Sequence, residues 1–284
     1  MTSMFNNDSP DRVAREEGIV VGQAGGRDLR VDVFLPPKAV ANGAGVLLIH
    51  GGGWISGDRT QLHGYGVLLG RAGYTSIACE YRLAPDAKWP AQIDDVRVAF
   101  EWFRANAGEL GVDVDHIAVE GNSAGGHLAL YLAGTTPGVA AVVAIYPPAD
   151  LQRRHVVAST QARVSPVKLL MPSLEPETLA GASANTYVSA DFPPTMLIHG
   201  NADTVVSVSQ SLRMYEQLVD AGAKAELHIF EGQPHSFDRD PGYGRECAAL
   251  MQLFFKRHVL PEGQQPGATG QGEPVSRQSS KVRS

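Results

Sequence analysis

The stretch VEGNSAGGHLALYLAG, residues 119–134, places Ser123 between Gly121 and Gly125. An apolar strand pattern precedes the serine and a helical pattern follows it. In such a turn the serine Oγ stands above the sheet, and small residues two positions away on each side let strand and helix approach closely. The first N–H groups of the helix, from Ala124 onward, point to where negative charge develops in acyl transfer. The pattern predicts a nucleophilic serine, with a packing turn as the alternative.

A second glycine motif reduces the weight of that alternative. The sequence HGGGW, residues 50–54, follows the apolar run GVLLIH and contains three successive glycines. Their backbone N–H groups can converge on a small anion without side-chain clash, as in the second half of a hydrolase oxyanion hole. A phosphate-binding loop is the rival interpretation, but the segment lacks GxGxxG and a following GK[ST]. The motif therefore indicates an oxyanion site.

A serine nucleophile needs a base, and nine histidines compete for that role. His235 lies in the polar loop EGQPHSF directly after the strand pattern AELHIF, at the sheet edge where Ser123 is expected. His228 falls inside that strand and His127 inside the helix after Ser123, so packing explains both better. His199 ends a strand, where local hydrogen bonding is expected. These placements favour His235.

The carboxylate that orients the base is predicted to be Asp203. It follows the strand pattern TMLIHG, again at the carboxyl edge of the sheet, where open α/β sheets place their sites. The chain order Ser, Asp, His is the one expected of an α/β-hydrolase. Asp238 and Asp240 are nearer to His235 in sequence and remain alternatives, although a surface role suits them better.

The whole composition bounds the possibilities. The 284 residues are 43% hydrophobic and carry a net charge of −6, which suits one sizeable core and gives no attraction to nucleic acid. The N-terminal sequence lacks the features of a secretory signal, and no apolar run approaches membrane-spanning length. Cys79 and Cys247 form no metal or disulfide pattern, so we expect two buried, reduced thiols and no metal site. These features predict a soluble cytoplasmic protein without a nucleic-acid or membrane partner.

The order of elements predicts one α/β domain over residues 1–260. A hairpin is expected between residues 18 and 36, and the apolar runs at 45–50 and 74–83 read as buried parallel strands with a helix between them. A helix at 91–107 follows, and strands and helices then alternate, which predicts a mostly parallel sheet covered on both faces. A cap insertion is expected at about 149–192, with helices at 166–171 and 176–183. Residues 261–284 read as a disordered tail.

The chain resembles the α/β-hydrolases of the hormone-sensitive-lipase and carboxylesterase-like group. The resemblance rests on HGGGWISGD, EYRLAPDAKWPAQIDDV, GNSAGGHLAL, HGNADTVV and EGQPHSF, which follow the family's order over residues 45–259. It implies an α/β-hydrolase fold and structural roles for Arg82 and Asp95. It also implies the following site residues: Ser123, Asp203 and His235 as the catalytic triad, and the N–H groups of Gly52, Gly53 and Ala124 as the oxyanion hole.

Two departures from the family pattern bear on the substrate. Asn122 precedes the serine where many members have Asp, and Trp54 follows the glycines where many have Phe; both are candidate substrate-binding residues. Fewer than about twenty residues precede the hairpin, whereas lipase-like members have a long N-terminal cap segment, so we expect a reduced cap and a more open site.

The resemblance predicts a serine carboxylesterase that hydrolyses short-chain acyl esters through an acyl-enzyme, with a small-molecule ester as partner and no cofactor. The same residues could cleave an amide, so an arylformamidase or another acyl-amide hydrolase is the alternative. A non-catalytic ligand receptor on this fold would be expected to lack a triad member, and all three candidates are present. Homodimers are common in the group, so a homodimer is one state to test.

Overall fold

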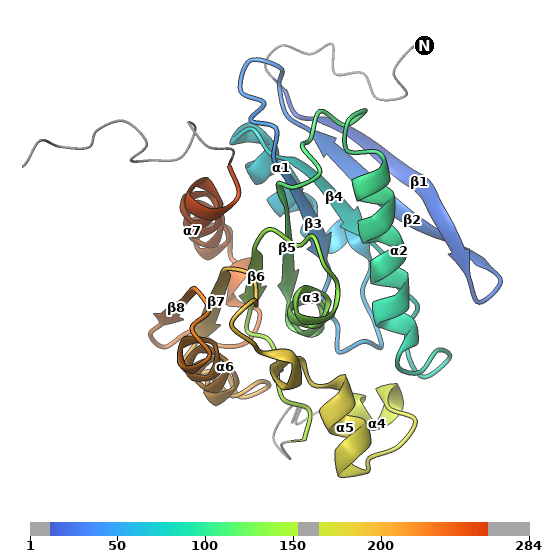
Figure 1. The fold of residues 1–284 in the computed structure, drawn as a ribbon, viewed down its shortest axis with the longest axis vertical. Helices are drawn as coiled ribbons and strands as arrows, with labels where there is room; N and C mark the ends of the chain where they lie inside the picture. The colour runs from blue at the N-terminus through green and yellow to red at the C-terminus, as the bar shows by residue number, and fades with distance from the viewer. Residues whose placement is uncertain (1–11, 153–164, 261–284) are drawn as a thin grey trace, which may run out of the picture.

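The computed structural model describes residues 12–152 and 165–260, which form an eight-stranded sheet covered on both faces by helices (Figure 1). The strand order is β1-β2-β4-β3-β5-β6-β7-β8; β1 and β2 form an antiparallel hairpin, β2 pairs antiparallel with β4, and the six strands β3 to β8 run parallel. The strands are β1 (Ala14–Ala24), β2 (Arg27–Leu35), β3 (Gly45–Ile49), β4 (Thr75–Cys79), β5 (Ile117–Asn122), β6 (Val142–Ile145), β7 (Thr195–Gly200) and β8 (Ala225–Phe230). The α/β-hydrolase fold with a mostly parallel sheet is thus confirmed.

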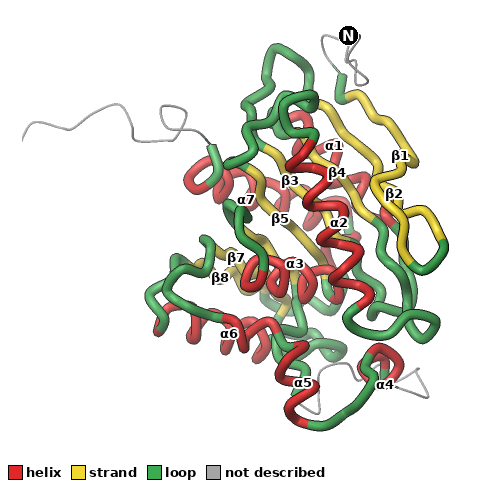
Figure 2. Tube along the Cα trace, turned by 45° about the vertical axis from the view of Figure 1, so that its right-hand side comes forward, coloured by secondary structure: helices red, strands yellow, loops and turns green. Residues whose placement is uncertain are grey.

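The long helices divide between the two faces of this sheet (Figure 2). Helices α2 (Ala91–Ala105), α3 (Ala124–Thr135) and α6 (Ser209–Asp220) pack over one face, and α1 (His63–Arg71) and α7 (Pro241–His258) over the other. Each face has its own apolar core. Short 3-10 helices η1 (Arg59–Leu62), η2 (Ala184–Tyr187) and η3 (Phe237–Arg239) lie in the connections. Because β3 to β8 are parallel, their carboxyl ends bring the loops after them to one edge.

The central strands form because both of their faces are covered. Every residue of β3, β4, β5, β6 and β7 is buried, which explains why their sequences are mostly apolar and do not alternate between apolar and polar residues. The two cysteines lie in this interior as free thiols, as expected. Burial raises the pKa of the Cys247 thiol to about 12. Among the residues that the structure describes, no helix is long and apolar enough to cross a membrane.

Strand β4 is shorter than the predicted strand at 74–83. The chain leaves the sheet after Cys79 because Arg82 turns toward α2: its backbone N–H and its guanidinium both donate to the Asp95 carboxylate, each at 2.8 Å. Asp95 is buried, so this bidentate ion pair satisfies a charge inside the protein. The pair fixes the segment between β4 and α2, which is the structural role that the resemblance implied.

The predicted insertion contains α4 (Pro166–Leu170), α5 (Pro176–Ala182) and η2 where the structure describes it. Its first part, 153–164, and the predicted tail, 261–284, lie outside the described residues. The described part is tied to the rest of the domain: the Trp89 N–H donates to the Leu170 carbonyl at 2.9 Å, and His127 Nε2 contacts the Ala182 carbonyl at 2.7 Å. Helix α4 thereby lies next to the edge of the sheet where the strands end.

Candidate active site

The turn between β5 and α3 holds Ser123 in a strained conformation. Its φ is 54°, a left-handed value that non-glycine residues rarely adopt, and such outliers persist only where the surroundings enforce them. A Cβ at Gly121 would collide with the backbone of Gly125, and one at Gly125 with the Ile49 carbonyl. The Ser123 N–H donates to the Ile145 carbonyl at 2.8 Å. The two glycines are therefore required by the close approach of β5, α3 and β3, as predicted from their spacing.

His235 and Asp203 meet Ser123 at the carboxyl edge of the sheet. Ser123 Oγ lies 3.0 Å from His235 Nε2, and His235 Nδ1 lies 2.6 Å from Asp203 Oδ2. His235 comes from the loop after β8 and Asp203 from the loop after β7. Three side chains distant in sequence thus form one hydrogen-bonded line, in which the imidazole can take a proton from the hydroxyl on one side while the carboxylate holds its other nitrogen.

The environment of Asp203 keeps its carboxylate ionised. Burial alone would raise its pKa, but hydrogen bonds from His199 and His235, the charge of His235 and the backbone N–H of Val206 hold the pKa well below the usual carboxyl range. Oδ1 accepts from the N–H groups of Val205 and Val206, both at 2.8 Å, so Oδ2 is the oxygen that faces His235. The loop after β7 therefore fixes the carboxylate in one orientation.

The HGGGW loop follows β3 and borders the same space. Gly52 has φ 116° and Gly53 φ 62°, and a Cβ at Gly52 would collide with the Ser56 carbonyl. Among residues 12–152 and 165–260, no oxygen accepts a hydrogen bond from the N–H of Gly52 or Gly53. Ala124 is the first residue of α3, where a helix leaves its N–H groups without an internal acceptor. N–H donors from the loop after β3 and from the start of α3 thus border one cavity.

The two candidate substrate-binding residues differ in their surroundings. Trp54 borders the cavity, but it is completely buried, and its ring packs edge-on against His127 with 5.3 Å between centroids. Asn122 also borders the cavity, and its amide nitrogen lies 3.2 Å from the Tyr146 hydroxyl. His50 is buried beneath the glycines and stacks on Tyr81, and burial lowers its pKa to about 4. Trp54 and His50 therefore anchor the two ends of the HGGGW segment by packing inside the protein.

The remaining histidines considered as bases have other contacts. His127 is fully buried, and burial lowers its pKa to about 4. His199 is also buried; it contacts the Ser211 hydroxyl at 2.7 Å and the Val206 carbonyl at 2.9 Å, and it lies 3.4 Å from Asp203 Oδ2. His228 lies on the edge strand β8, near Glu226. Within the described part of the chain, no group of His, Cys, Asp and Glu side chains could hold a metal ion.

Ser123 and His235 open into a cavity of about 1180 Å³. Its lining comes from seven regions: the HGGGW loop, the segment from Gln61 through α1, the Ser123 turn, Tyr146 and Pro148 after β6, Pro166 of α4, Val205 after β7, and the segment from His235 to Arg245. The α1 wall was not predicted, because the sequence between β3 and β4 indicated only a crossover helix. The cavity is large enough for a substrate with groups on both sides of an ester.

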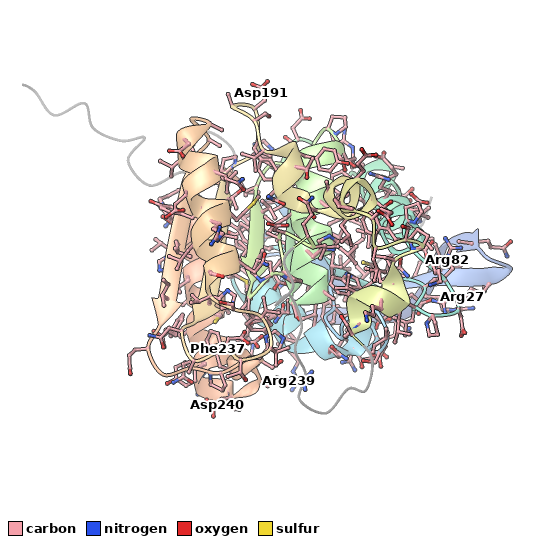
Figure 3. All side chains as sticks on the ribbon, turned by 90° about the horizontal axis from the view of Figure 1, so that it is seen from below. Arg27, Arg82, Asp191, Phe237, Arg239 and Asp240 are labelled. Carbon is pink, nitrogen blue, oxygen red and sulfur yellow. The ribbon has the colours of Figure 1, made fainter. Side chains whose placement is uncertain are left out.

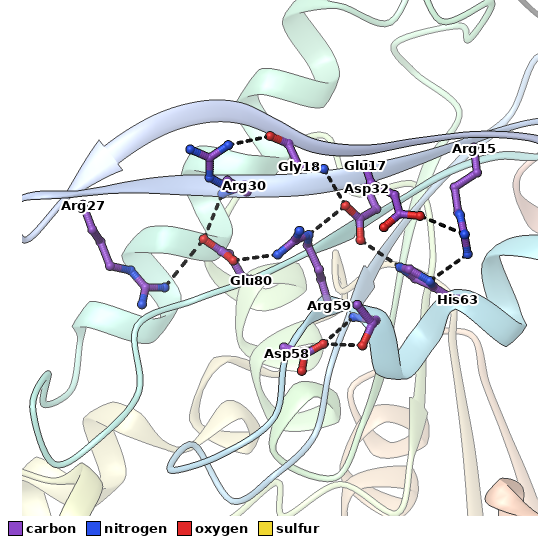
Figure 4. Close-up of polar contacts among 11 residues, drawn as sticks. Arg15, Glu17, Gly18, Arg27, Arg30, Asp32, Asp58, Arg59, His63 and Glu80 are labelled. Atoms are coloured by element: carbon purple, nitrogen blue, oxygen red, sulfur yellow. Dashed lines mark hydrogen bonds and ion pairs between the residues drawn. The ribbon is translucent and has the colours of Figure 1, made fainter.

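A buried ionic network holds the start of that α1 wall (Figure 4). Asp32 of β2 is fully buried and contacts Arg59 Nε at 2.7 Å, His63 Nε2 at 2.8 Å and the Gly18 N–H at 2.7 Å. Burial would raise the pKa of Asp32, but these hydrogen bonds bring it below the usual value. Arg59 also donates to Glu80 at 3.0 Å. The network ties the hairpin to His63, which lines the cavity.

Asp238, which the sequence suggested as a surface residue, is instead part of the cavity wall. Its carboxylate accepts from the Tyr146 hydroxyl, from Asn122 Nδ2 at 2.5 Å and from the Tyr65 hydroxyl at 3.0 Å. The Tyr146 ring lies 4.5 Å from the His235 ring, centroid to centroid. One carboxylate therefore connects the His235 loop, the residue before Ser123, the end of β6 and α1.

This network has an unpaired acidic neighbour, Glu120 of β5. Glu120 is completely buried, and neither of its carboxylate oxygens has a hydrogen-bond partner among the residues that the structure describes. Burial and then the charge of Asp238 raise its pKa well above the usual value. Burial likewise raises the pKa of Tyr146, and Asp238 adds to that shift. The neutral form of Glu120 is therefore favoured next to the Asp238 cluster.

Replacing Asp238 with asparagine is expected to lower kcat/KM for an activated ester by roughly tenfold. The amide can offer one acceptor oxygen but sets its NH₂ against the donors of Tyr65 and Asn122, and losing a hydrogen bond to a charged group costs about 1.5–3 kcal/mol. Asp240→Asn is the matched control, because the Asp240 side chain accepts from backbone N–H groups at the start of α7, its only donors in the described part of the chain, and asparagine is an equally good cap. Equal kinetics for both variants would contradict a positioning role for Asp238.

A family model and a curated relative each match more than half of this chain. A family model described as BD-FAE matches residues 31–218. The esterase LipC of Mycobacterium tuberculosis is 35% identical over 68% of this chain and 53% of its own length, and this chain spans about half the length of the first curated relatives it matches.

Solved structures superpose on a larger share of this chain than the sequence match to LipC covers. A truncated carbohydrate esterase from gut microbiota has a TM-score of 0.74 at 25% identity, covering 87% of this chain and 98% of the other. The propionate-bound esterase Est2 of Thermogutta terrifontis has a TM-score of 0.71 at 25% identity, with 87% and 94% coverage. The family match covers most of the sheet and the Ser123 turn, and the two solved structures share the fold over 87% of this chain. The chain belongs to the BD-FAE family of the α/β-hydrolase superfamily.

Proposed function

We propose that this protein is a serine carboxylesterase that hydrolyses short-chain acyl esters through a Ser123–His235–Asp203 triad. The observation that carries the proposal is the hydrogen-bonded line from Ser123 Oγ through His235 to Asp203, with distances of 3.0 and 2.6 Å. The line opens into the cavity beside free N–H donors. The names of the relatives support an ester as the substrate, and the propionate bound to Est2 supports a short acyl group.

The first step forms an acyl-enzyme. His235 Nε2 accepts the Ser123 proton as Oγ attacks the ester carbonyl, and Asp203 stabilises the imidazolium that results. The N–H groups of Gly52, Gly53 and Ala124 donate hydrogen bonds to the oxyanion. These hydrogen bonds are strongest in the transition state, where the negative charge develops. His235 then gives its proton to the alkoxide, which leaves as the alcohol.

The second step releases the acid. Water takes the place of the alcohol, His235 removes one of its protons, and the hydroxide attacks the acyl carbonyl; the proton then returns to Ser123 Oγ. The strained backbone at Ser123 keeps Oγ clear of α3 in both steps. Asp203 remains ionised throughout, because its pKa is held well below the usual range.

A substrate series tests the proposed substrate class. Purified protein would be assayed with p-nitrophenyl acetate, butyrate, octanoate and palmitate, and with N-formylkynurenine. The proposal expects the highest kcat/KM for acetate or butyrate, with activity lost in Ser123→Ala. A much higher kcat/KM for N-formylkynurenine would replace the esterase with an arylformamidase using the same residues. No Ser123-dependent turnover on any of the five would favour a non-catalytic receptor.

A further inference from the structure

The cavity that contains Ser123 extends between α1 and the start of α7. Tyr65, Val67, Leu68 and Arg71 line it from α1, and Arg239 of η3 and Arg245 of α7 line it from the other side. Helices α1 and α7 pack against each other on the same face of the sheet. The lining of this cavity thus combines an apolar α1 wall with three arginines from three different elements.

The spacing along α1 separates Arg71 from the reacting serine. The Tyr65 hydroxyl contacts Asp238, which in turn contacts Asn122 beside Ser123. Arg71 lies six residues further along α1, which is roughly 9 Å of helix rise. A group that reaches Arg71 from Ser123 therefore passes the apolar side chains of Val67 and Leu68.

The charge in this part of the cavity is unbalanced. Asp238 is the only carboxylate in the described lining, and three donors already surround it. Within residues 12–152 and 165–260, the guanidinium groups of Arg71, Arg239 and Arg245 have no ion pair or hydrogen bond, although the chain as a whole carries a net charge of −6. Some exposed arginines elsewhere do form ion pairs: the Arg27 guanidinium lies 3.7 Å from the Glu80 carboxylate.

Figure 3 shows Arg239 apart from Arg27 and Arg82. Arg239 lies beside Phe237 and Asp240 among the C-terminal elements, on the other side of the view from Arg27 and Arg82. Arg82 is held by Asp95 at 2.8 Å and is thereby used in the fold. Arg239 has no comparable partner among the described residues, so its guanidinium is available to a bound anion.

From this arrangement we propose that the preferred substrates are esters that carry a carboxylate several carbons from the scissile bond. The hydrocarbon contacts the apolar α1 wall, and the carboxylate lies among Arg71, Arg239 and Arg245, whose planar guanidinium groups suit it. This proposal rests on the serine esterase proposed above. The charge can belong to the acyl part or to the alcohol part, and the two are separable by experiment.

The test compares charged esters with neutral esters of matched length. Mono-p-nitrophenyl adipate is paired with p-nitrophenyl hexanoate for a charge on the acyl part, and the acetate ester of ω-hydroxyhexanoate with hexyl acetate for a charge on the alcohol part. The measured quantity is the ratio of kcat/KM, charged over neutral, within each pair. We expect a ratio above one in one of the pairs, falling as NaCl is raised, because screening weakens exposed charge interactions.

Single variants Arg71→Gln, Arg239→Gln and Arg245→Gln are each expected to lower that ratio by roughly two- to fivefold, the range for exposed ion pairs. Arg213→Gln is the matched control, since Arg213 is exposed on α6 and outside this cavity. Ratios at or below one in both pairs, or ratios that the three variants do not change, would overturn the proposal while Ser123-dependent hydrolysis of the neutral esters continued. Loss of all Ser123-dependent hydrolysis would instead remove the esterase on which it rests.

Discussion

Ser123→Ala is expected to lower kcat for p-nitrophenyl butyrate by roughly a millionfold, and His235→Ala by a similar factor. Removal of Oγ removes the nucleophile, and removal of the imidazole leaves Oγ, 3.0 Å away, without a base. Because the two groups act in one step, the double variant should be no slower than either single variant. Steady-state kinetics of the three variants, with protein repurified to exclude host esterases, provides the measurement.

A matched serine separates this result from a general loss of fold. Ser189 is exposed in the loop before β7 and lies outside the cavity, so Ser189→Ala should keep the wild-type kcat. Thermal unfolding of Ser123→Ala should show an intact fold, since only one hydroxyl is removed. A kcat for Ser123→Ala within tenfold of wild type, with the same Tm, would mean that another residue is the nucleophile.

The line of Ser123, His235 and Asp203 could be predicted because parallel strands end at one edge. Each residue follows a strand pattern that the sequence makes plain, and each lies in the first loop positions after that strand. Their positions after parallel strands are enough to place the three residues at one edge of the sheet, without any hydrogen-bond distance. The glycines at 121 and 125 were likewise predictable, since their spacing reports a close approach of backbones that the structure contains.

Asp238 could not be placed from the sequence. Ser236 adopts a left-handed conformation with φ 60°, and the 3-10 helix η3 that follows turns the chain back toward β5. This brings Asp238 to Asn122, 116 positions away, although the sequence favoured a surface position for Asp238. The one available signal was Glu120: a carboxyl group in a strand of otherwise apolar residues indicates a polar environment on that face.

The α1 wall escaped prediction for a different reason. The amphipathic pattern of a short helix shows which side faces the sheet, but the side that borders a cavity contains both apolar and charged residues. Tyr65, Val67 and Arg71 therefore look like an ordinary half-buried surface. Only the packing of α1 against α7 makes that surface part of the site.

Asp203→Asn is expected to lower kcat at neutral pH by about ten thousandfold. The backbone N–H groups of Val205 and Val206 require an acceptor at Oδ1, so the asparagine oxygen takes that position and its NH₂ faces His235. His235 Nδ1 must then accept, the ring proton moves to Nε2, and Nε2 can no longer take the proton of Ser123. Steady-state kinetics at pH 7 to 8 gives the ratio of kcat between wild type and Asp203→Asn. Asp191→Asn is the control, because Asp191 is exposed and lies outside the cavity.

The same variant separates the two carboxylates that the sequence left as alternatives. If Asp238 were the orienting acid, Asp238→Asn would be the variant with the ten-thousandfold loss and Asp203→Asn the milder one. Stability adds an independent measurement: the depressed pKa of Asp203 contributes stability that is fully present above its unfolded pKa of about 3.9 and is lost as the pH falls through the folded pKa. The Tm difference between wild type and Asp203→Asn should therefore be largest above about pH 5 and shrink on acidification, because protonation of the wild-type carboxylate makes it resemble the variant.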